Sequence, residues 1–362
     1  MTSPGSAVRP TLLPLPAHPA GLAWPTEEWT CGAIDARIDE TSLEALLDRA
    51  FTDPEPEDMD LTYGVVIVQR GRIVAERYAK GVSPRDAFCS WSMAKSVTNS
   101  LIGILVRQGR LDIHQPIPVR EWAEDDPRRA ITVDHLLRMV DGLRFREAEH
   151  LGGGSVRYYS EDESDVIPML FGEGRKDVAG FAATLPKVCE PEERWNYNSG
   201  ASNLLSRLVR DTIGGGEPEM RAFMQEELFG PLGMKTADPH FDEAGNFIGG
   251  SHCYASVRDF ARFGYLFLRD GVWDGHRILP KGWVDYCRTP STQSAGTYGA
   301  HFWTIPGSLG TFYCSGMGGQ RVLICPKLDL IVARMGRTAP HKVGAVVDYG
   351  KQLIDAFRPT AG

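Results

Sequence analysis

Ser92 and Lys95 stand three residues apart where an amphipathic pattern begins, within FCSWSMAKSVTNSLIGILVRQG at 88–109. Residues i and i+3 share one face of a helix, roughly 5–6 Å apart at Cβ. A serine in the first turn also lies near unpaired backbone N–H groups and the positive end of the helix dipole, which can stabilise an oxyanion. The pair therefore has the residue types and spacing of a nucleophile and its base.

A base role for Lys95 requires that its side chain lose a proton near neutral pH. A free lysine has a pKa of about 10.4 and is protonated at pH 7. Burial, here beneath Trp91 and Met93, can lower a lysine pKa to about 7–8, where it accepts a serine proton. The alternative is that Ser92 caps the helix and Lys95 is solvated, because a four-residue motif also arises by chance.

Two further segments have residue types that would complete such a site. Tyr197, in WNYNSGASNLL at 195–205, precedes a run of small residues where a helix starts. YCSGMGGQRVLIC at 313–325 is glycine-rich and leads into a β-strand. Taken alone, Tyr197 is a buried aromatic as readily as a catalytic one, and the glycines fit a bulge at the start of a strand.

Together the three segments resemble a known family, the penicillin-recognising serine hydrolases with a β-lactamase/transpeptidase-like fold. That family carries S-x-x-K on a helix, a Tyr or Ser motif in a helical region and a K/H-x-G-like strand near the C-terminus. This chain has Ser92-Met93-Ala94-Lys95, Tyr197-Asn198-Ser199 and Cys314-Ser315-Gly316 in that order. The resemblance runs from about residue 50 to the C-terminus, and G-x-x-G-Q at 316–320 is similar to the 6-aminohexanoate-dimer hydrolase and family VIII carboxylesterase branch.

The resemblance implies a role for each matched residue. Ser92 would attack a carbonyl and form an acyl-enzyme, and Lys95 would take its proton. Tyr197 would relay a proton to the leaving amine or alkoxide, with its pKa lowered if Lys95 lies near. The backbone N–H groups of Ser92 and Met317 would form the oxyanion hole. Substrate contacts are expected from Tyr159, Ser199, Gly316 and Gln320, and neither a metal nor a cofactor is implied.

Two positions depart from the family pattern. Enzymes that act on β-lactams or peptidoglycan usually carry a Lys or His where this chain has Cys314, and that cation can pair with the substrate's carboxylate. The third position of the second motif is Ser199 rather than an amide. We therefore expect a hydrolase of small linear amides or esters. A β-lactamase or DD-peptidase is the alternative, and a non-catalytic scaffold related to penicillin-binding proteins is the second alternative.

Other chemistries have weaker support in the sequence. His240, Asp242 and His252 match no metal-ligand spacing that we can assign. Cys314 lacks a convincing histidine partner for a thiol nucleophile. No G-x-S-x-G elbow is present, which argues against an α/β-hydrolase.

The composition indicates an ordinary globular protein acting on a small molecule. Hydrophobic residues make up 42% of the 362 residues and charged ones 24%, with a net charge of -8. That charge offers no basic surface for nucleic acid, and no run approaches the ~18 apolar residues of a membrane span. Seven scattered cysteines without a C-x-x-C pair fit reduced thiols in a cytoplasm. Assembly into a homodimer is left open.

The element pattern predicts an α+β fold, with an antiparallel sheet flanked by helices and a mainly helical insertion. A hairpin is expected at 61–78 around Arg70 and Gly71, and strands at 319–325 and 328–336. Helices are expected at 133–140, 202–213, 256–271 and 343–357, with a short one from Pro280. The proposed divisions are a proline-rich arm at 1–45, a sheet domain at 46–110 and 255–362, and an inserted helical domain at 111–254.

Overall fold

The computed structural model describes residues 12–152, 155–307 and 309–359. Its main sheet has six strands in the order β11-β12-β13-β14-β1-β2, and each neighbouring pair is antiparallel. Their bounds are β11 Trp303–Thr304, β12 Phe312–Gly316, β13 Gln320–Cys325, β14 Leu330–Arg337, β1 Leu61–Gln69 and β2 Arg72–Tyr78. The predicted hairpin and the two predicted C-terminal strands are confirmed. The sheet therefore joins strands from both halves of the sequence.

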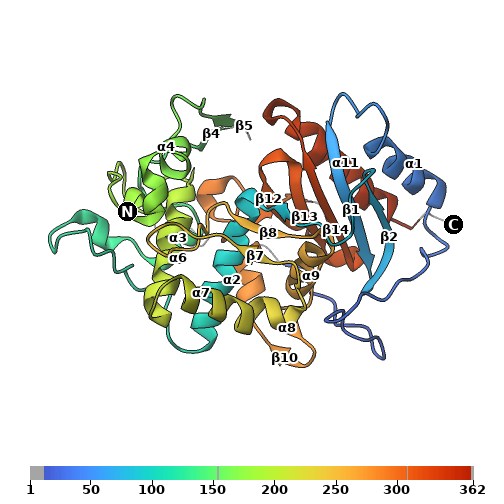
Figure 1. Ribbon diagram of the computed structural model, residues 1–362, viewed down its shortest axis with the longest axis horizontal. Helices are drawn as coiled ribbons and strands as arrows, with labels where there is room; N and C mark the ends of the chain where they lie inside the picture. The colour runs from blue at the N-terminus through green and yellow to red at the C-terminus, as the bar shows by residue number, and fades with distance from the viewer. Residues whose placement is uncertain (1–11, 153–154, 308, 360–362) are drawn as a thin grey trace, which may run out of the picture.

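Alternate residues of each central strand fill two separate cores. On β1, Val65 and Ile67 belong to a cluster with α1 (Glu40–Ala50) and α11 (Val343–Ala356). Val66 and Val68 belong to the larger cluster that contains α9 (Val257–Leu268). The run VVIV in β1 is thus buried on both faces, because a strand's side chains point alternately to opposite sides. Figure 1 shows the sheet at the right with α1 and α11 beside it.

The helical region lies beside the sheet and is centred on α2 and α6 (Figure 1). α2 spans Ala94–Arg107 and α6 spans Ser199–Ile213. Around them lie α3 Val133–Leu137, α4 Val166–Leu170, α5 Val178–Ala183, α7 Glu217–Met224, the three-residue α8 Gly230–Leu232 and α10 Trp283–Arg288. Shorter strands complete the fold: β3 Phe88–Cys89, β4 Ala148–Gly152, β5 Ser155–Tyr158, β6 Asn196–Tyr197, β7 Asp238–Pro239, β8 Cys253–Ala255, β9 Val272–Trp273 and β10 His276–Arg277.

Helix α2 is buried on all sides between residues 94 and 105, although its sequence predicts a single apolar face. Its polar side chains bond to backbone carbonyl groups of neighbouring segments. Ser96 donates to the carbonyl of His301 at 2.7 Å, Thr98 to that of Gly249 at 3.0 Å, and Asn99 to that of Ala300 at 3.0 Å. Buried polar groups are tolerated when they are hydrogen-bonded, so the helix is locked between several loops.

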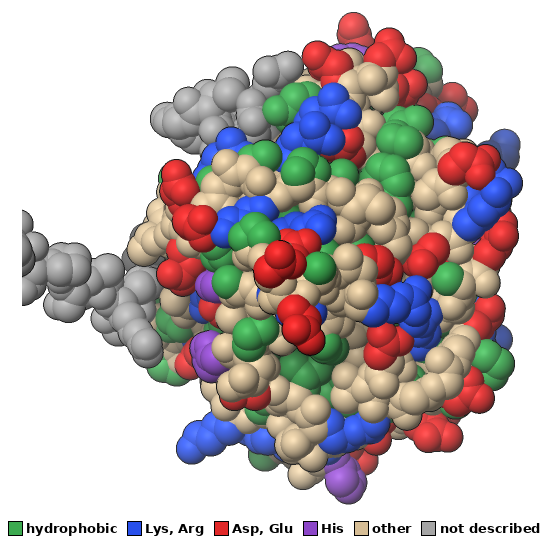
Figure 2. Space-filling view, turned by 90° about the vertical axis from the view of Figure 1, so that its left-hand side faces the viewer, with side chains coloured by type: hydrophobic (Ala, Val, Ile, Leu, Met, Phe, Trp, Pro, Cys, Tyr) green, Lys and Arg blue, Asp and Glu red, His purple; other side chains and the backbone are tan. Residues whose placement is uncertain are grey.

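The proline-rich arm, as far as it is described, packs along α9. The Nε of Arg262 donates to the carbonyl of Pro25 at 2.7 Å, and the guanidinium of Arg269 to that of Pro16 at 3.0 Å. Residues 1–11 of the predicted arm lie outside the described residues. None of the helices within the described ranges is long and apolar enough to cross a membrane. Figure 2 shows acidic and basic side chains interspersed over the helical side of the molecule.

Candidate active site

Ser92 lies in a short 3-10 turn, Trp91–Met93, that leads directly into α2. The preceding strand β3 pairs with β8, and the Ser90 N–H donates to the carbonyl of Cys253 at 2.9 Å. Trp91 has a positive φ of 45°, which is uncommon for a large side chain. Such strain persists only where the surroundings hold it, and here it falls on the residue directly before Ser92.

Lys95 is 1% exposed, and its ammonium group donates three hydrogen bonds. The acceptors are the Ser92 hydroxyl at 2.9 Å, the Ser199 hydroxyl at 2.7 Å and the carbonyl of Gly250 at 2.8 Å. All three acceptors are uncharged. Burial therefore lowers the pKa of Lys95 to about 8, with the charge of Glu147 opposing the shift. The structure brings together the serine and lysine that the spacing predicted to share one face.

Tyr197 lies against the Lys95 side chain. Its ring centroid is 4.7 Å from the Lys95 Nζ atom, and the ring packs against Trp303 at 5.5 Å and Tyr298 at 5.8 Å. Burial and then the charge of Glu147 raise the pKa of Tyr197 well above 10, while a hydrogen bond with Ser92 works in the opposite direction. The expected lowering of this pKa is wrong, because loss of solvent outweighs any gain from Lys95. Tyr197 is a proton-bearing phenol at neutral pH.

Gly316 brings the sheet edge against the turn that holds Ser92. A Cβ atom at this position would lie 2.2 Å from the carbonyl oxygen of Ser90, so only glycine allows the approach. Met317 follows and is 57% exposed, and Gly318 has a φ of 73°. The backbone of the predicted oxyanion residue Met317 is thus at the end of the strand that packs on the Ser92 turn.

Cys314 faces α2 from the same strand and is buried. Burial raises the pKa of its thiol to about 12, with a smaller opposing effect from a hydrogen bond with Ser96. A thiol with this pKa carries almost no thiolate at neutral pH, and the thiolate is the nucleophilic form. The residue is buried against α2 and supplies no positive charge.

The other predicted contact residues lie in different settings. Ser199 is buried between Lys95 and Glu147. Gln320 is also buried, and its amide bonds to both backbone groups of Gly336, at 2.6 and 2.8 Å, which links β13 to β14. Tyr159 is half-buried, and its backbone N–H donates to the carbonyl of Glu147 at 3.2 Å. Of the predicted residues, Ser92, Lys95, Tyr197 and Ser199 meet at one point, whereas the Gln320 side chain is occupied elsewhere.

Glu147 is a site residue that sequence reasoning missed. One carboxylate oxygen accepts from the Ser199 backbone N–H at 2.8 Å and the other from the Ser199 hydroxyl at 2.9 Å. The residue lies just before β4, in the charged stretch GLRFREAEH at 142–150, where nothing distinguishes it from surface acids. Only the folded chain brings it to the start of α6.

His301 is a second residue that the sequence did not single out. Its Nδ1 atom lies 2.9 Å from the carbonyl oxygen of Lys95, and its Nε2 atom 3.2 Å from the Ser202 hydroxyl. Because a carbonyl only accepts, Nδ1 carries the proton and Nε2 accepts from the serine. Burial, and then the charge of Lys95, lower the pKa of His301 to about 3, so it is neutral across the physiological range. It joins α2 to α6.

The three residues considered for a metal are not arranged as ligands. The His240 and His252 rings lie 6.5 Å apart. The carboxylate of Asp242 accepts instead from the Val178 backbone N–H at 2.9 Å and from the Asn246 backbone N–H at 2.8 Å. Asp242 therefore holds the start of α5 to its own loop.

An open groove of about 700 Å³ begins beside Met317 and Trp91. Tyr63 and Phe88 stack in its wall with their ring centroids 4.6 Å apart, and Tyr254 contributes a further ring. Arg337 and Glu55 are exposed residues of the same lining. The groove has room for an extended molecule alongside the predicted oxyanion residue.

Comparison with known proteins identifies the same architecture elsewhere. A protein-family model described as Beta-lactamase matches residues 55–354. A 6-aminohexanoate-dimer hydrolase from Paenarthrobacter ureafaciens is 22% identical over 317 residues, which cover 81% of this chain and 77% of that protein.

Two solved structures show how far the likeness extends in three dimensions. The octameric penicillin-binding protein homologue from Pyrococcus abyssi has a TM-score of 0.65 at 18% identity, covering 89% of this chain and 78% of its own. EstCE1, a hydrolase with promiscuous acyltransferase activity, has a TM-score of 0.63 at 14% identity, covering 88% and 97%. The fold is β-lactamase/transpeptidase-like, an antiparallel sheet flanked by helices, and the predicted fold class is confirmed.

Proposed function

The chain belongs to the Beta-lactamase family, and from that premise we propose that it is a serine hydrolase that cleaves small linear amides or esters through an acyl-enzyme. The observation that carries the proposal is the 2.9 Å contact between the Lys95 ammonium and the Ser92 hydroxyl. Lys95 is buried and has a pKa of about 8, so a useful fraction is neutral near pH 7–8.

The proposed reaction begins when neutral Lys95 takes the hydroxyl proton of Ser92 as its oxygen attacks the substrate carbonyl. The backbone N–H groups of Ser92 and Met317 stabilise the negative charge that forms on the carbonyl oxygen. The Tyr197 phenol donates its proton to the departing amine or alkoxide. Lys95, whose Nζ atom lies 4.7 Å from the Tyr197 ring centroid, then returns the proton to the phenolate. Water then attacks the acyl-enzyme by the reverse sequence and releases the acid.

The substrate class follows from the groove and from Cys314. The groove beside Met317 is open and has a volume of about 700 Å³, which would admit an unbranched chain. Cys314 is uncharged where family members that act on β-lactams usually hold a cation, which argues against a carboxylate pairing at that point. The relative from P. ureafaciens is a 6-aminohexanoate-dimer hydrolase, and EstCE1 is a hydrolase with acyltransferase activity. The first of these relatives supports a linear amide as the substrate.

The test compares wild type with Ser92→Ala on three substrates: a p-nitrophenyl short-chain ester, a linear aminohexanoate dimer and a chromogenic cephalosporin. We expect turnover of the ester or the dimer, poor turnover of the cephalosporin, and no turnover by the variant. Rapid cephalosporin hydrolysis would instead favour a β-lactamase. Turnover of none would favour a scaffold.

The cellular location and the assembly are part of the same proposal. All seven cysteines are free, and we propose that the protein works in the reducing cytoplasm. The P. abyssi homologue is octameric, and for this chain we propose a homodimer. Light scattering coupled to gel filtration gives the mass in solution, and a single-chain mass would exclude the dimer.

A further inference from the structure

We propose that Glu147 and Ser199 form a proton relay that carries the proton of the buried Lys95 ammonium to solvent, so that enzyme in which Lys95 is protonated can enter the catalytic cycle. The inference rests on the proposed function of Lys95 as the base. It assigns Glu147 as a positioning residue, because the carboxylate acts on the reaction through Ser199 and Lys95.

The hydrogen bonds form one continuous chain with a fixed direction. The Lys95 ammonium only donates, so the Ser199 oxygen accepts from it at 2.7 Å. The single hydroxyl hydrogen of Ser199 is then directed to the Oε1 atom of Glu147 at 2.9 Å. The Ser199 backbone N–H holds Oε2 at 2.8 Å, which fixes the carboxylate at the start of α6. Each donor faces an acceptor along the whole path.

The other two hydrogen bonds of Lys95 cannot carry its proton to solvent. The carbonyl of Gly250 accepts a hydrogen bond at 2.8 Å but has no hydrogen to pass on. Ser92 is the proposed nucleophile, and it is the residue from which Lys95 must take a proton. With Lys95 1% exposed, direct release to water is blocked. Glu147 is half-buried and reaches the surface, so the chain through Ser199 leads to solvent.

The transfer balances without a further reactant. Ser199 passes its hydroxyl hydrogen to Glu147 while it accepts a hydrogen from Lys95, which leaves an amine, an intact hydroxyl and a carboxylic acid. The acid gives its proton to water and becomes a carboxylate again. Lys95 is then ready to accept the hydroxyl hydrogen of Ser92.

Several other titratable groups surround Lys95, and none of them can replace Glu147. Tyr197 holds its proton, His301 is neutral and bonds to the Lys95 carbonyl, and the buried Cys314 thiol is protonated. Arg321 on β13 lowers the pKa of Tyr197, and Tyr158 on β5 raises it. Glu147 is the charge that raises the pKa of Lys95. Loss of this charge should therefore lower that pKa below about 8.

The experiment measures kcat and kcat/KM of wild type, Glu147→Gln, Glu147→Asp, Ser199→Ala and Ser199→Thr between pH 5 and 10. Glu147→Gln should lower kcat at least about tenfold, as expected for a lost proton-transfer group, and move the acid limb of kcat/KM to lower pH. Ser199→Ala should lower kcat similarly with a smaller shift of the limb. Glu147→Asp and Ser199→Thr should each restore part of kcat.

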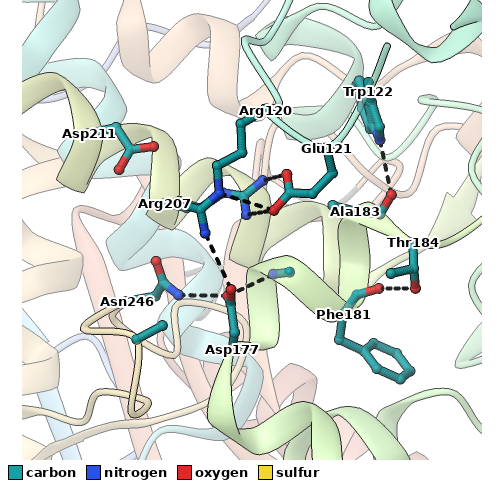
Figure 3. Close-up of polar contacts among 12 residues, drawn as sticks. Arg120, Glu121, Trp122, Asp177, Phe181, Ala183, Thr184, Arg207, Asp211 and Asn246 are labelled. Carbon is teal, nitrogen blue, oxygen red and sulfur yellow. Dashed lines mark hydrogen bonds and ion pairs between the residues drawn. The ribbon is translucent and has the colours of Figure 1, made fainter.

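A matched control is available at Glu121, whose side chain is 30% exposed and whose carboxylate pairs with Arg207 at 2.7 and 2.8 Å (Figure 3). Glu121→Gln makes the same chemical change away from Ser92 and should leave the pH profile in place. Thermal melts of every variant separate lost folding from lost proton transfer.

The inference is overturned if folded Glu147→Gln and Ser199→Ala keep the wild-type kcat and acid limb, or if Glu121→Gln shifts them equally. The Ser92→Ala variant distinguishes failure of the proposed function from failure of the proposed relay. If that variant still turns over substrate, the proposed function itself fails. If it is inactive while the Glu147 and Ser199 variants behave like wild type, only the relay fails.

Discussion

Lys95 on α2 and Arg207 on α6 are both buried cations, but only Arg207 is hydrogen-bonded directly to a carboxylate. Arg207, 3% exposed, forms two direct hydrogen bonds to the carboxylate of Glu121 within the ion-paired cluster of Figure 3. Lys95 donates its hydrogen bonds to uncharged oxygens, and the carboxylate of Glu147 lies beyond Ser199. Arginine keeps its proton in any such setting, whereas a buried lysine can release it. The site therefore holds a cation whose proton can move, and the cluster holds one that cannot.

The largest expected effect comes from replacing the buried lysine at position 95 with an arginine. Lys95→Arg keeps a positive charge but removes a group that can act as a base, so kcat should fall by about 10³–10⁴-fold. The reciprocal control, Arg207→Lys, should leave kcat near wild type and lower the melting temperature. Steady-state kinetics with an ester substrate measures both. An active Lys95→Arg enzyme would remove Lys95 from the proposed chemistry.

The pH dependence tests whether the proton on Lys95 moves in the range that its pKa of about 8 implies. The base must be neutral, so kcat/KM should rise with pH, fall about tenfold per pH unit below the pKa, and level off above it. The profile is measured with a substrate that is stable from pH 5 to 10. A flat profile between pH 6 and 9 would contradict the assignment.

Breaking the ion pair between Glu121 and Arg207 should lower the free energy of unfolding. Glu121→Ala leaves the Arg207 guanidinium buried without its carboxylate, and we expect a loss of about 3 kcal/mol in the free energy of unfolding, as for a broken buried pair. The Glu121 side chain is 30% exposed, which places the value at the lower end of the range for such pairs. Urea unfolding measures it. Loss of kcat in a folded Glu121→Ala protein would show that the ion pair of Glu121 and Arg207 also affects catalysis, which would contradict a purely stabilising role.

Asp141 offers a third and smaller contrast, a buried acid without a cation. Its Oδ1 atom accepts from the Leu143 N–H at 2.9 Å, and burial raises its pKa to about 7. The folded state therefore keeps a proton that the unfolded state releases near pH 4. The contribution of Asp141 to the free energy of unfolding should therefore be largest below about pH 4 and fall as pH rises towards 7, by on the order of 2 kcal/mol between pH 5 and 7.

Asp141→Asn is the matched variant for this acid. Its amide has no proton to lose, so the free energy of unfolding should vary less between pH 5 and 8 than in wild type. Urea unfolding at several pH values gives the comparison. Parallel curves for the two proteins would show that Asp141 does not titrate in this window.

Local patterns predicted the main elements because each depends on short-range periodicity. The β1–β2 hairpin, β13, β14 and α9 all follow from alternation or from a 3.6-residue repeat. The contact of Ser92 with Lys95 also follows, because three residues separate them on one helix turn. These features need no knowledge of the distant chain.

The parts that sequence reasoning missed depend on long-range packing. Glu147 lies 52 residues before Ser199 in the sequence, and nothing local marks the acid that will meet it. His301 approaches Lys95 from 206 residues away. The pKa of Tyr197 was predicted in the wrong direction because burial by Trp303 and Tyr298 is a property of the assembled fold.

The central claim is that Ser92 carries an acyl group during turnover, and rapid-quench peptide mapping tests it most directly. The protein is mixed with a p-nitrophenyl short-chain ester, quenched in acid within a fraction of a turnover, digested and examined by mass spectrometry. The account predicts an acyl group on the peptide that contains Ser92 in wild type, and none in Ser92→Ala. An acyl group on another residue, or turnover that persists in Ser92→Ala, would contradict it.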